Sequence, residues 1–237
     1  MRQRNEIRSK PAHARQMASE ASDDYLKAIF ALGGAAGDQV PASEVAARLM
    51  LAGASVTKML QKLSSCVPPL LVYEKHRGGR LAKAGRERAL EIVRHHRLIE
   101  TFLHQVLDYP WDEVHDEAER LEHFISERLE ARIAAKLGYP QVDPHGHAIP
   151  ALDGTLPSGT SETLAQVGVG GQRKVVSVSD HNPEMLRYLG AQGIGPGTVL
   201  KLAERLPFEG GYRVLIAASK KSVLLSGPPA SAIFVSV

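Results

Sequence analysis

The segment between positions 114 and 123 restricts the structure of this chain more than any other, because it interleaves apolar residues with potential metal ligands. The ligand-type residues lie at offsets of four, seven and eight from the first. They are His115, Glu119, Glu122 and His123. At about 100° per residue, these positions share one stripe of a helix. An adjacent apolar stripe is formed by Val114, Ala118, Leu121 and Ile125.

A helix with these two stripes packs with one face and offers nitrogen and carboxylate ligands beside it. Charge next to a hydrophobic core is costly unless it is paired or coordinated, so the pattern favours a metal site. The alternative is a solvated face that carries His and Glu by chance. We expect the helix to run from about Asp112 to Leu137 and to stop at Gly138-Tyr139-Pro140.

A long helix, expected from about Lys83 to Leu107, precedes this segment and supplies further ligands. His96 and Glu100 are four residues apart, so they lie on the same helix face. The neighbouring His95 and the later His104 are expected on the surface.

The composition sets outer limits on the class of protein. A length of 237 residues allows one to three small domains. We expect no membrane span because the chain has no run of about 18 apolar residues, and its basic, polar N-terminus does not resemble a secretory signal. The single Cys66 excludes an intramolecular disulfide and fits a reducing cytoplasm. The net charge of +3 permits a nucleic-acid partner without requiring one.

The N-terminal third of the chain reads as an arm followed by a compact domain. Residues 1–20 lack apolar periodicity and are expected to form a basic, flexible arm, and residues 21–88 form the domain. Its predicted elements are a helix from Ser22 as N-cap to Gly33-Gly34, a helix opening at Pro41, a helix from about Ala54 to Ser64, and a hairpin turning at Gly78-Gly79.

Three short helices followed by a glycine-tipped hairpin describe a winged helix-turn-helix. The third helix has an apolar inner stripe and a polar outer stripe, as groove binding requires. The side chains expected to reach bases or phosphates are Ser55, Thr57, Lys58 and Lys62 on this helix, with Lys75 and Arg77 on the wing. The alternative is a generic helical bundle with a solvated basic face.

The C-terminal part of the chain changes to a β pattern. Residues 141–165 are rich in Pro, Gly, Ser and Thr and are expected to form a linker. Residues 166–237 then contain five β-rich runs, with a short helix expected from Pro183 to Leu189. This pattern predicts a small β-barrel.

Several of these runs resemble the manganese-transport-regulator branch of the diphtheria toxin repressor family. The runs are Ser55–Leu63 with Val72–Lys75 and Arg77-Gly78, His96–Leu98, and Val114–His123. Asp143–Pro150 resembles the family linker Cys-Pro-His-Gly-x-Pro-Ile-Pro, from which Asp143 and Ala148 depart, and Asn182–Leu189 resembles the opening of the family's SH3-like domain. The resemblance implies a mainly α fold with small β content: a winged helix-turn-helix, a metal-binding and dimerisation domain at 89–140, and an SH3-like (FeoA-like) domain at 166–237.

Members of this family are dimeric, metal-activated transcription factors, so the resemblance implies two metal sites per subunit. The primary site would be Asp24, Glu119, Glu122 and His123. The ancillary site would be His96, Glu100 and His115, with Glu184 and His181 added by the SH3-like domain. Asp23 lies beside Asp24 and could take its place.

The resemblance also bears on the metal and the partners. Iron-responsive members usually carry Met and Cys where this chain has Asp24 and Glu119, and a site of oxygen and nitrogen donors suits Mn²⁺ or, alternatively, Fe²⁺. Lys27 stands where manganese-type members carry an acid, which puts their closely bridged metal pair in doubt here. The implied protein is a cytoplasmic regulator, expected to be a repressor, that binds a palindromic double-stranded operator as a homodimer.

Two other classes of function compete with this interpretation. A helical chain rich in Glu and His could be a di-metal carboxylate enzyme, but such bundles use paired Glu-x-x-His motifs and no glutamate here has a histidine three residues later. An adaptor that binds peptides through its barrel is the third possibility. The barrel segment has few aromatic residues for a peptide groove: Tyr188, Phe208, Tyr212 and Phe234.

Overall fold

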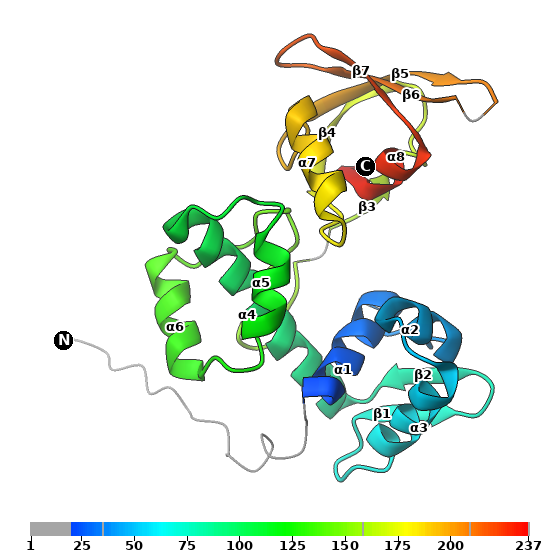
Figure 1. The fold of residues 1–237 in the computed structure, drawn as a ribbon, viewed down its shortest axis with the longest axis vertical. Helices are drawn as coiled ribbons and strands as arrows, with labels where there is room; N and C mark the ends of the chain where they lie inside the picture. Colours follow the sequence, from blue (N-terminus) through cyan, green and yellow to red (C-terminus); the bar gives the residue numbers. More distant parts are fainter. Residues whose placement is uncertain (1–19, 35, 158, 209, 237) are drawn as a thin grey trace. The chain divides into compact units, whose positions relative to one another are not determined.

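A computed structural model describes residues 20–34, 36–157, 159–208 and 210–236 (Figure 1). The chain divides into two compact units, of which the first reaches to Ala89 and the second begins at Leu90. The arm expected at residues 1–20 lies outside the described residues, except for Glu20, which begins the first helix.

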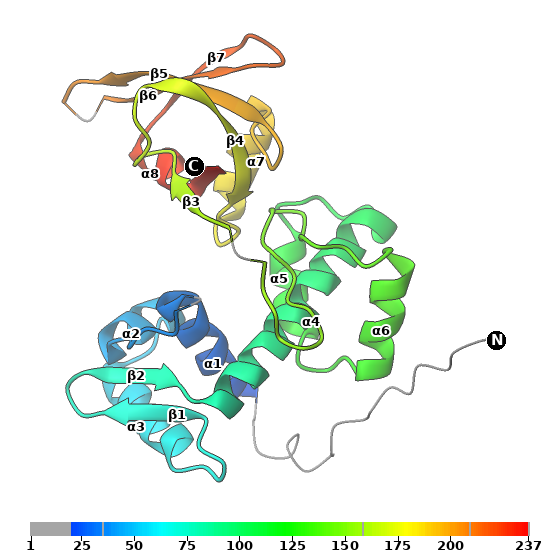
Figure 2. The same cartoon turned by 180° about the vertical axis from the view of Figure 1, so that it is seen from behind.

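The first unit is a winged helix-turn-helix, as predicted (Figures 1 and 2). Its elements are α1 (Glu20–Gly33), α2 (Ala42–Leu49), α3 (Gly53–Ser64), β1 (Leu71–Glu74), β2 (Gly78–Leu81) and the start of α4 (Lys83–Leu107). Apolar residues at helical spacing on α1 and α3 form its core with Val45 of α2 and Leu71 of β1. The fully buried members include Leu26, Ile29, Val45, Val56, Leu60 and Leu71.

Two local predictions in this unit are wrong. Ser22 is not an N-cap: α1 begins at Glu20 and Ser22 is buried inside its first turn. The hairpin does not turn at its glycine pair. The turn lies at 75–77, where His76 takes a positive φ of 65°, and Gly78 and Gly79 open β2 instead. Gly78 is needed there because the backbone of the segment before α2 lies against it, and that segment pairs with the hairpin through reciprocal hydrogen bonds between Val40 and Gly79 of 2.9 Å each.

The helices of the second unit follow the predicted order, but one of the predicted helices is divided into two. The helix α4 has its predicted bounds, Lys83–Leu107. The single helix expected from Asp112 to Leu137 is wrong, because the chain forms α5 (Val114–Leu121) and α6 (Glu127–Lys136) instead. The physical reason lies at Ser126, whose hydroxyl accepts a hydrogen bond from the Leu129 N–H at 3.2 Å and so starts a new helix.

The C-terminal part of the second unit is the SH3-like β domain, with a six-stranded antiparallel sheet in the order β3-β8-β4-β5-β6-β7. The strands are β3 (Ser161–Thr163), β4 (Gly170–Val178), β5 (Val199–Leu206), β6 (Gly211–Ile216), β7 (Ser222–Leu225) and β8 (Ile233–Ser236). The helices are α7 (Pro183–Gln192) and α8 (Gly227–Ala232). The five predicted strands are confirmed. β3 falls inside the segment expected to be linker, and α7 extends beyond Leu189 to its end before Gly193.

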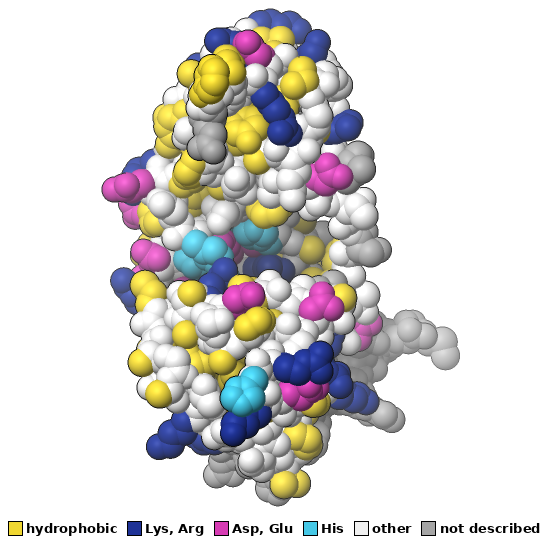
Figure 3. Space-filling view, turned by 90° about the vertical axis from the view of Figure 1, so that its right-hand side faces the viewer, with side chains coloured by type: hydrophobic (Ala, Val, Ile, Leu, Met, Phe, Trp, Pro, Cys, Tyr) yellow, Lys and Arg dark blue, Asp and Glu magenta, His cyan; other side chains and the backbone are white. Residues whose placement is uncertain are grey.

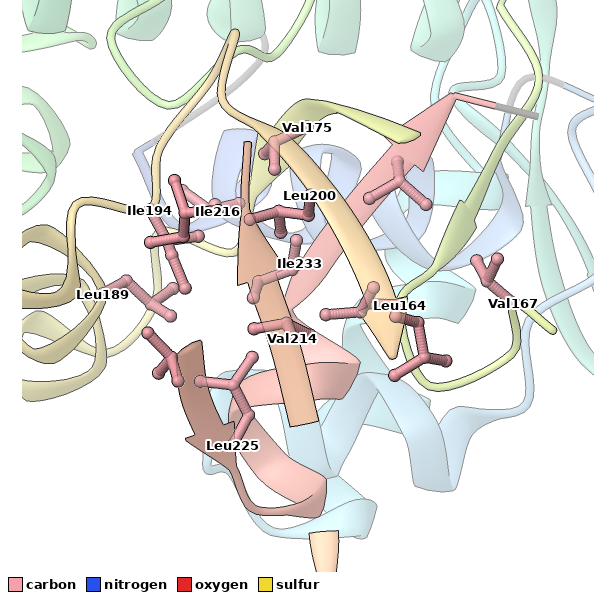
Figure 4. Packing of buried hydrophobic residues seen from close by; sticks show 14 of the residues in the cluster. Leu164, Val167, Val175, Leu189, Ile194, Leu200, Val214, Ile216, Leu225 and Ile233 are labelled. Carbon is pink, nitrogen blue, oxygen red and sulfur yellow. The ribbon is translucent and has the colours of Figure 1, made fainter. Parts of the chain in front are cut away.

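The core of this domain comes from alternate positions of its strands and from α7. In Figure 4 the labelled side chains, among them Leu200, Val214 and Ile233, point toward one another between the strands. Each of these three is completely buried. This packing fixes the start of α7 and the segment before it, which carries Asp180 and His181.

The surface gives two further facts. On the face seen in Figure 3, Lys and Arg side chains are interspersed with Asp and Glu and do not gather in one patch. Among the described helices, none combines the length and the apolar character needed to cross a membrane.

Candidate metal centre and nucleic-acid interface

His96 lies at the centre of a group of carboxylates and imidazoles in the second unit. It is buried on α4, and both of its ring nitrogens face ligand-type atoms. Nδ1 lies 2.5 Å from Oε2 of Glu122, and Nε2 lies 2.9 Å from Oε1 of Glu100 and 3.1 Å from Nδ1 of His115. The sequence placed His96 in the ancillary set alone, whereas the structure makes it common to two clusters.

The first cluster contains His96, Glu119 and Glu122, each with a ligand atom within 4.8 Å of the others. Oε1 of Glu119 lies 3.9 Å from Nδ1 of His96, and Nε2 of His123 lies 3.4 Å from Oε1 of Glu122. Glu122 and His123 follow the last residue of α5, so the turn at 122–126, not a continuous helical stripe, places them. Two of the predicted primary ligands, Glu119 and Glu122, therefore lie together at His96, and a third, His123, adjoins Glu122.

The fourth predicted primary ligand, Asp24, lies on α1 in the first unit, where its side chain is half-buried. Its neighbour Asp23 has a different function. The Asp23 carboxylate accepts two hydrogen bonds from the Arg88 guanidinium, at 2.8 and 2.6 Å, and ties α1 to the start of α4. This bidentate pairing argues against Asp23 as a metal ligand.

The second cluster contains His96, Glu100, His115 and Asp180, again with ligand atoms within 4.8 Å of one another. Asp180 was missed by the sequence reasoning, although an acid directly before His181 was a usable signal. The His181 ring packs edge-on against the His115 ring at 5.3 Å, and its Nδ1 lies 3.1 Å from Oδ1 of Asp180. Glu184, the other predicted ligand from this domain, is exposed on the first turn of α7 and belongs to none of the clusters among the described residues.

The segment before β3 adds a third group, Asp143, His145 and His147. No function was predicted for these two histidines. Oδ1 of Asp143 accepts hydrogen bonds from the backbone N–H groups of His145 at 2.8 Å and His147 at 3.0 Å, which closes a tight turn. His145 is completely buried; its Nε2 lies 2.7 Å from the Trp111 carbonyl oxygen and its Nδ1 lies 3.7 Å from Oε1 of Glu100. The spacing of two residues between successive members could have revealed the group.

The electrostatics of these groups reflect their close packing. Burial by itself would raise the pKa of Glu100, but His96, His115 and His145 outweigh it and hold that pKa well below its usual range. Burial likewise opposes ionisation of Asp180, yet His147 and His181 lower its pKa to about 2. Burial disfavours the charged form of His147, and the carboxylates of Asp143 and Asp180 reverse this and raise its pKa.

The donor atoms fit a divalent cation. Among the described residues, several buried ligand-type atoms of these clusters make no hydrogen bond. They are Oε2 of Glu100, Oδ2 of Asp143, Nδ1 of His145 and Nδ1 of His147. Such atoms are expensive to bury unless a proton or a metal satisfies them. All donors are oxygen or nitrogen, the set preferred by hard and borderline divalent ions.

Two histidines, His95 and His104, were predicted to lie on the surface, and this is correct for one of them. His104 is exposed, as expected, with its Nδ1 2.9 Å from the Tyr109 carbonyl oxygen. The surface position predicted for His95 is wrong, because its side chain is buried between α4 and α6. A residue beside His96 on a helix of this length turns by about 100°, which here points it toward α6.

The residues predicted to contact nucleic acid lie on the surface of the first unit. On α3, Ser55, Lys58 and Lys62 are exposed and Thr57 is half-buried, while the opposite face buries Val56, Leu60 and Leu63. On the wing, Lys75 and Arg77 are exposed, and Nη1 of Arg77 donates to Oε2 of Glu74 at 3.0 Å. The third helix therefore has the buried and exposed faces that a recognition helix needs.

A winged helix followed by a helical segment dense in metal ligands and an SH3-like domain defines a metal-responsive DNA-binding protein. Family models match each part. Residues 17–78 match the N-terminal DNA binding domain of iron dependent repressors, 82–151 match their metal binding and dimerisation domain, and 162–237 match the FeoA domain. The chain belongs to the family of metal-dependent repressors that includes the diphtheria toxin repressor.

Individual relatives agree with this assignment. A diphtheria toxin repressor of Corynebacterium jeikeium is 33% identical over 136 residues, which are 56% of this chain and 55% of that protein, so the match spans about half the length of that relative. The regulator MntR of Bacillus pumilus is 33% identical over 46% of this chain and 74% of its own length. The solved structure of a manganese-dependent transcriptional repressor in complex with manganese is 41% identical, with a TM-score of 0.83 over 90% of this chain and 98% of that one. The family consists of transcriptional repressors, and the enzyme alternative is therefore rejected.

Proposed function

We propose that this protein is a metal-activated transcriptional repressor of metal-ion homeostasis genes, which acts in the cytoplasm as a homodimer on a palindromic operator. One observation carries the proposal: the buried His96 has each ring nitrogen against a carboxylate, Glu122 on one side and Glu100 on the other. Neither an uncharged ligand nor a hydrogen-bond network that only stabilises the fold requires carboxylate clusters on both sides of one imidazole. Two divalent cations per subunit account for both.

The primary site in this proposal consists of Asp24, Glu119, Glu122 and His123, with His96 beside them. Asp24 belongs to the winged helix-turn-helix of the first unit, and the other ligands belong to the second unit. The inclusion of Asp24 therefore rests on the family resemblance. The ancillary site consists of His96, Glu100 and His115, completed by Asp180, with His181 packed against it and Glu184 one turn farther along.

The cations neutralise carboxylates that otherwise repel one another, and this neutralisation is the chemistry they supply. The protein's own residues do the rest. By the family resemblance, Asp24 would share the primary cation with Glu122 and His123, and this shared ligation would restrict the winged helix relative to the dimerisation helices. A homodimer has two winged helices, each with its recognition helix α3. To bind successive major grooves, these two helices must lie about 34 Å apart, and restricting the winged helices would hold them at this separation. With both sites filled, the binding-competent population would be favoured.

Manganese is the proposed effector, with Fe²⁺ the other candidate. The clusters contain only oxygen and nitrogen donors, and one solved relative, 41% identical, is a manganese-dependent transcriptional repressor. Glu119 is the residue proposed to set this choice, because a carboxylate there keeps the primary site hard. Lys27, half-buried on α1, brings a positive charge where a second bridging carboxylate would stand, so the two metals are proposed to bind separately.

The test is a DNA-binding titration of the full chain against Mn²⁺, Fe²⁺, Zn²⁺ and Mg²⁺ on palindromic promoter fragments. We expect a shifted complex that contains two subunits and forms with Mn²⁺ but not with Mg²⁺ or with chelator. Equal affinity in Mn²⁺ and in chelator contradicts a metal switch, and a complex of one subunit per fragment contradicts the dimer.

Lys58→Ala is expected to weaken DNA binding without changing stability, because Lys58 is exposed on the outer face of α3. If its ammonium contacts a phosphate, the slope of log affinity against log salt should flatten by about one. Lys201→Ala, an exposed lysine of the SH3-like domain, is the matched control and should leave both affinity and slope unchanged. An unaltered slope and affinity in Lys58→Ala would remove this residue from the interface.

A further inference from the structure

A further group of ligand-type side chains joins α4 to α6, away from the two clusters around His96. One ring nitrogen of His95 and one carboxylate oxygen each of Glu91 and Glu127 lie within 4.8 Å of one another. Glu130, one turn beyond Glu127, borders the group, with its Oε2 3.3 Å from Nε2 of His95. Glu91 and His95 are four residues apart on α4, so they present their side chains on one face toward α6.

The hydrogen bonding of His95 fixes its tautomer. Nδ1 lies 3.2 Å from the carbonyl oxygen of Glu122, which can only accept a hydrogen bond, so Nδ1 carries the proton. In the neutral ring, Nε2 is then a lone-pair donor. It is buried 3.3 Å from Oε2 of Glu130, and in the neutral ring neither of these two atoms carries a proton to donate to the other. A lone pair directed at carboxylates is satisfied only by a second proton or by a cation.

The hydrogen bond from His95 Nδ1 to the Glu122 carbonyl oxygen is of a kind that also occurs in metal sites. Histidines that bind a metal through one nitrogen usually donate the other N–H to a carbonyl or carboxylate, which holds the ring in place. His95 already has this arrangement, with only 2% of its surface exposed. Its ring is therefore oriented before any cation binds.

The charges around His95 are those that attract a cation. The carboxylates of Glu91 and Glu127 share a hydrogen bond, and burial together with this like-charged neighbour raises the pKa of Glu127. Glu130 is balanced in part by Arg94, whose Nε lies 2.5 Å from its Oε1. Once a cation displaces the proton that Glu91 and Glu127 share, three carboxylates against one guanidinium leave two negative charges, the charge that one divalent cation neutralises. Glu127 is exposed, which gives an ion access from solvent.

We propose that Glu91, His95, Glu127 and Glu130 form a third binding site for a divalent cation of the borderline class, such as Mn²⁺ or Zn²⁺. One imidazole nitrogen and three carboxylate oxygens supply its donors. The site joins α4 to the first turn of α6. Through the contact of His95 with the Glu122 carbonyl, it also stabilises the turn at 122–126, which carries Glu122 and His123 of the proposed primary site.

The test compares metal content of the full chain after equilibrium dialysis against Mn²⁺ and against Zn²⁺, measured by elemental analysis per mole of protein. Glu127→Gln is expected to bind one equivalent less than the wild-type chain, with the tighter equivalents retained. His95→Gln should lose the same equivalent, and Glu113→Gln, an exposed acid of the same unit outside every cluster, should lose none.

The outcomes separate this site from the proposed function. Loss of one equivalent in both Glu127→Gln and His95→Gln supports the third site whether or not the chain binds DNA. Unchanged metal content in both folded variants overturns it and leaves a second proton on His95 as the explanation. Loss of the same equivalent in Glu113→Gln also overturns it, since surface charge alone would then account for the bound ion.

Discussion

Replacing Glu122 by Gln is expected to abolish metal-activated DNA binding while leaving the chain folded. The Glu122 side chain is completely buried and lies 2.5 Å from the His96 ring, so it is the most sequestered carboxylate of the first cluster. Glutamine keeps its size and removes its charge. Loss of even an outer hydrogen-bond partner of a metal ligand costs about 10–100-fold in affinity, and loss of a ligand charge should cost at least that much.

Mn²⁺ affinity measured by calorimetry, followed by gel shift at fixed Mn²⁺, checks this expectation. Glu117→Gln is the matched control, because Glu117 lies on the same helix but pairs only with Arg120, at 3.1 Å on the surface, where such a pair contributes little. A Glu122→Gln chain with near-ultraviolet circular dichroism like the wild type and Mn²⁺ affinity within about twofold of it would remove Glu122 from the ligands.

The sequence predicted the fold well where local signals agree. The bounds of α4, the third helix with its buried Val56, Leu60 and Leu63, and the five main strands follow from periodicity alone. The break between α5 and α6 was not predicted, because the apolar pattern continues through it and only the cap at Ser126 marks it. A cap of this kind competes with helix continuation by about 1 kcal/mol, which is too small to dominate a periodicity argument.

The composition of the ligand groups was also predicted only where it depends on local structure. Spacing along a helix grouped His96 with Glu100 and His115 with Glu119, since residues four apart on one helix are neighbours whatever the fold. Glu122 lies beyond the end of α5, so its position depends on the turn at 122–126. Asp180 and His145 come from loops of irregular backbone, and only the packing of the SH3-like domain brings them to Glu100 or His115. The burial of His95 also depends on where α6 lies, which no sequence pattern on α4 can specify.

The winged helix should be most sensitive to a change at Gly78. This residue has a φ of 95° in the hairpin, and a Cβ built on it would lie 1.9 Å from the Val40 carbonyl oxygen and 2.7 Å from the Pro41 Cα. Both contacts are with backbone, so no side chain can move aside. Gly78→Ala therefore combines a strained backbone, at about 1–3 kcal/mol, with overpacking, at about 1–3 kcal/mol.

We expect Gly78→Ala to lower the free energy of unfolding by about 2–6 kcal/mol, the sum of these two costs, and to weaken DNA binding at every metal concentration. The hairpin would have to separate from the Val40 segment, whose reciprocal hydrogen bonds with Gly79 fix the wing beside α3. Gly53→Ala is the control, because a Cβ there meets nothing within 4 Å and alanine favours the first turn of α3. Denaturant unfolding of both variants measures the difference. Equal midpoints for Gly78→Ala and Gly53→Ala would show that the close approach of the hairpin to Val40 does not hold the wing.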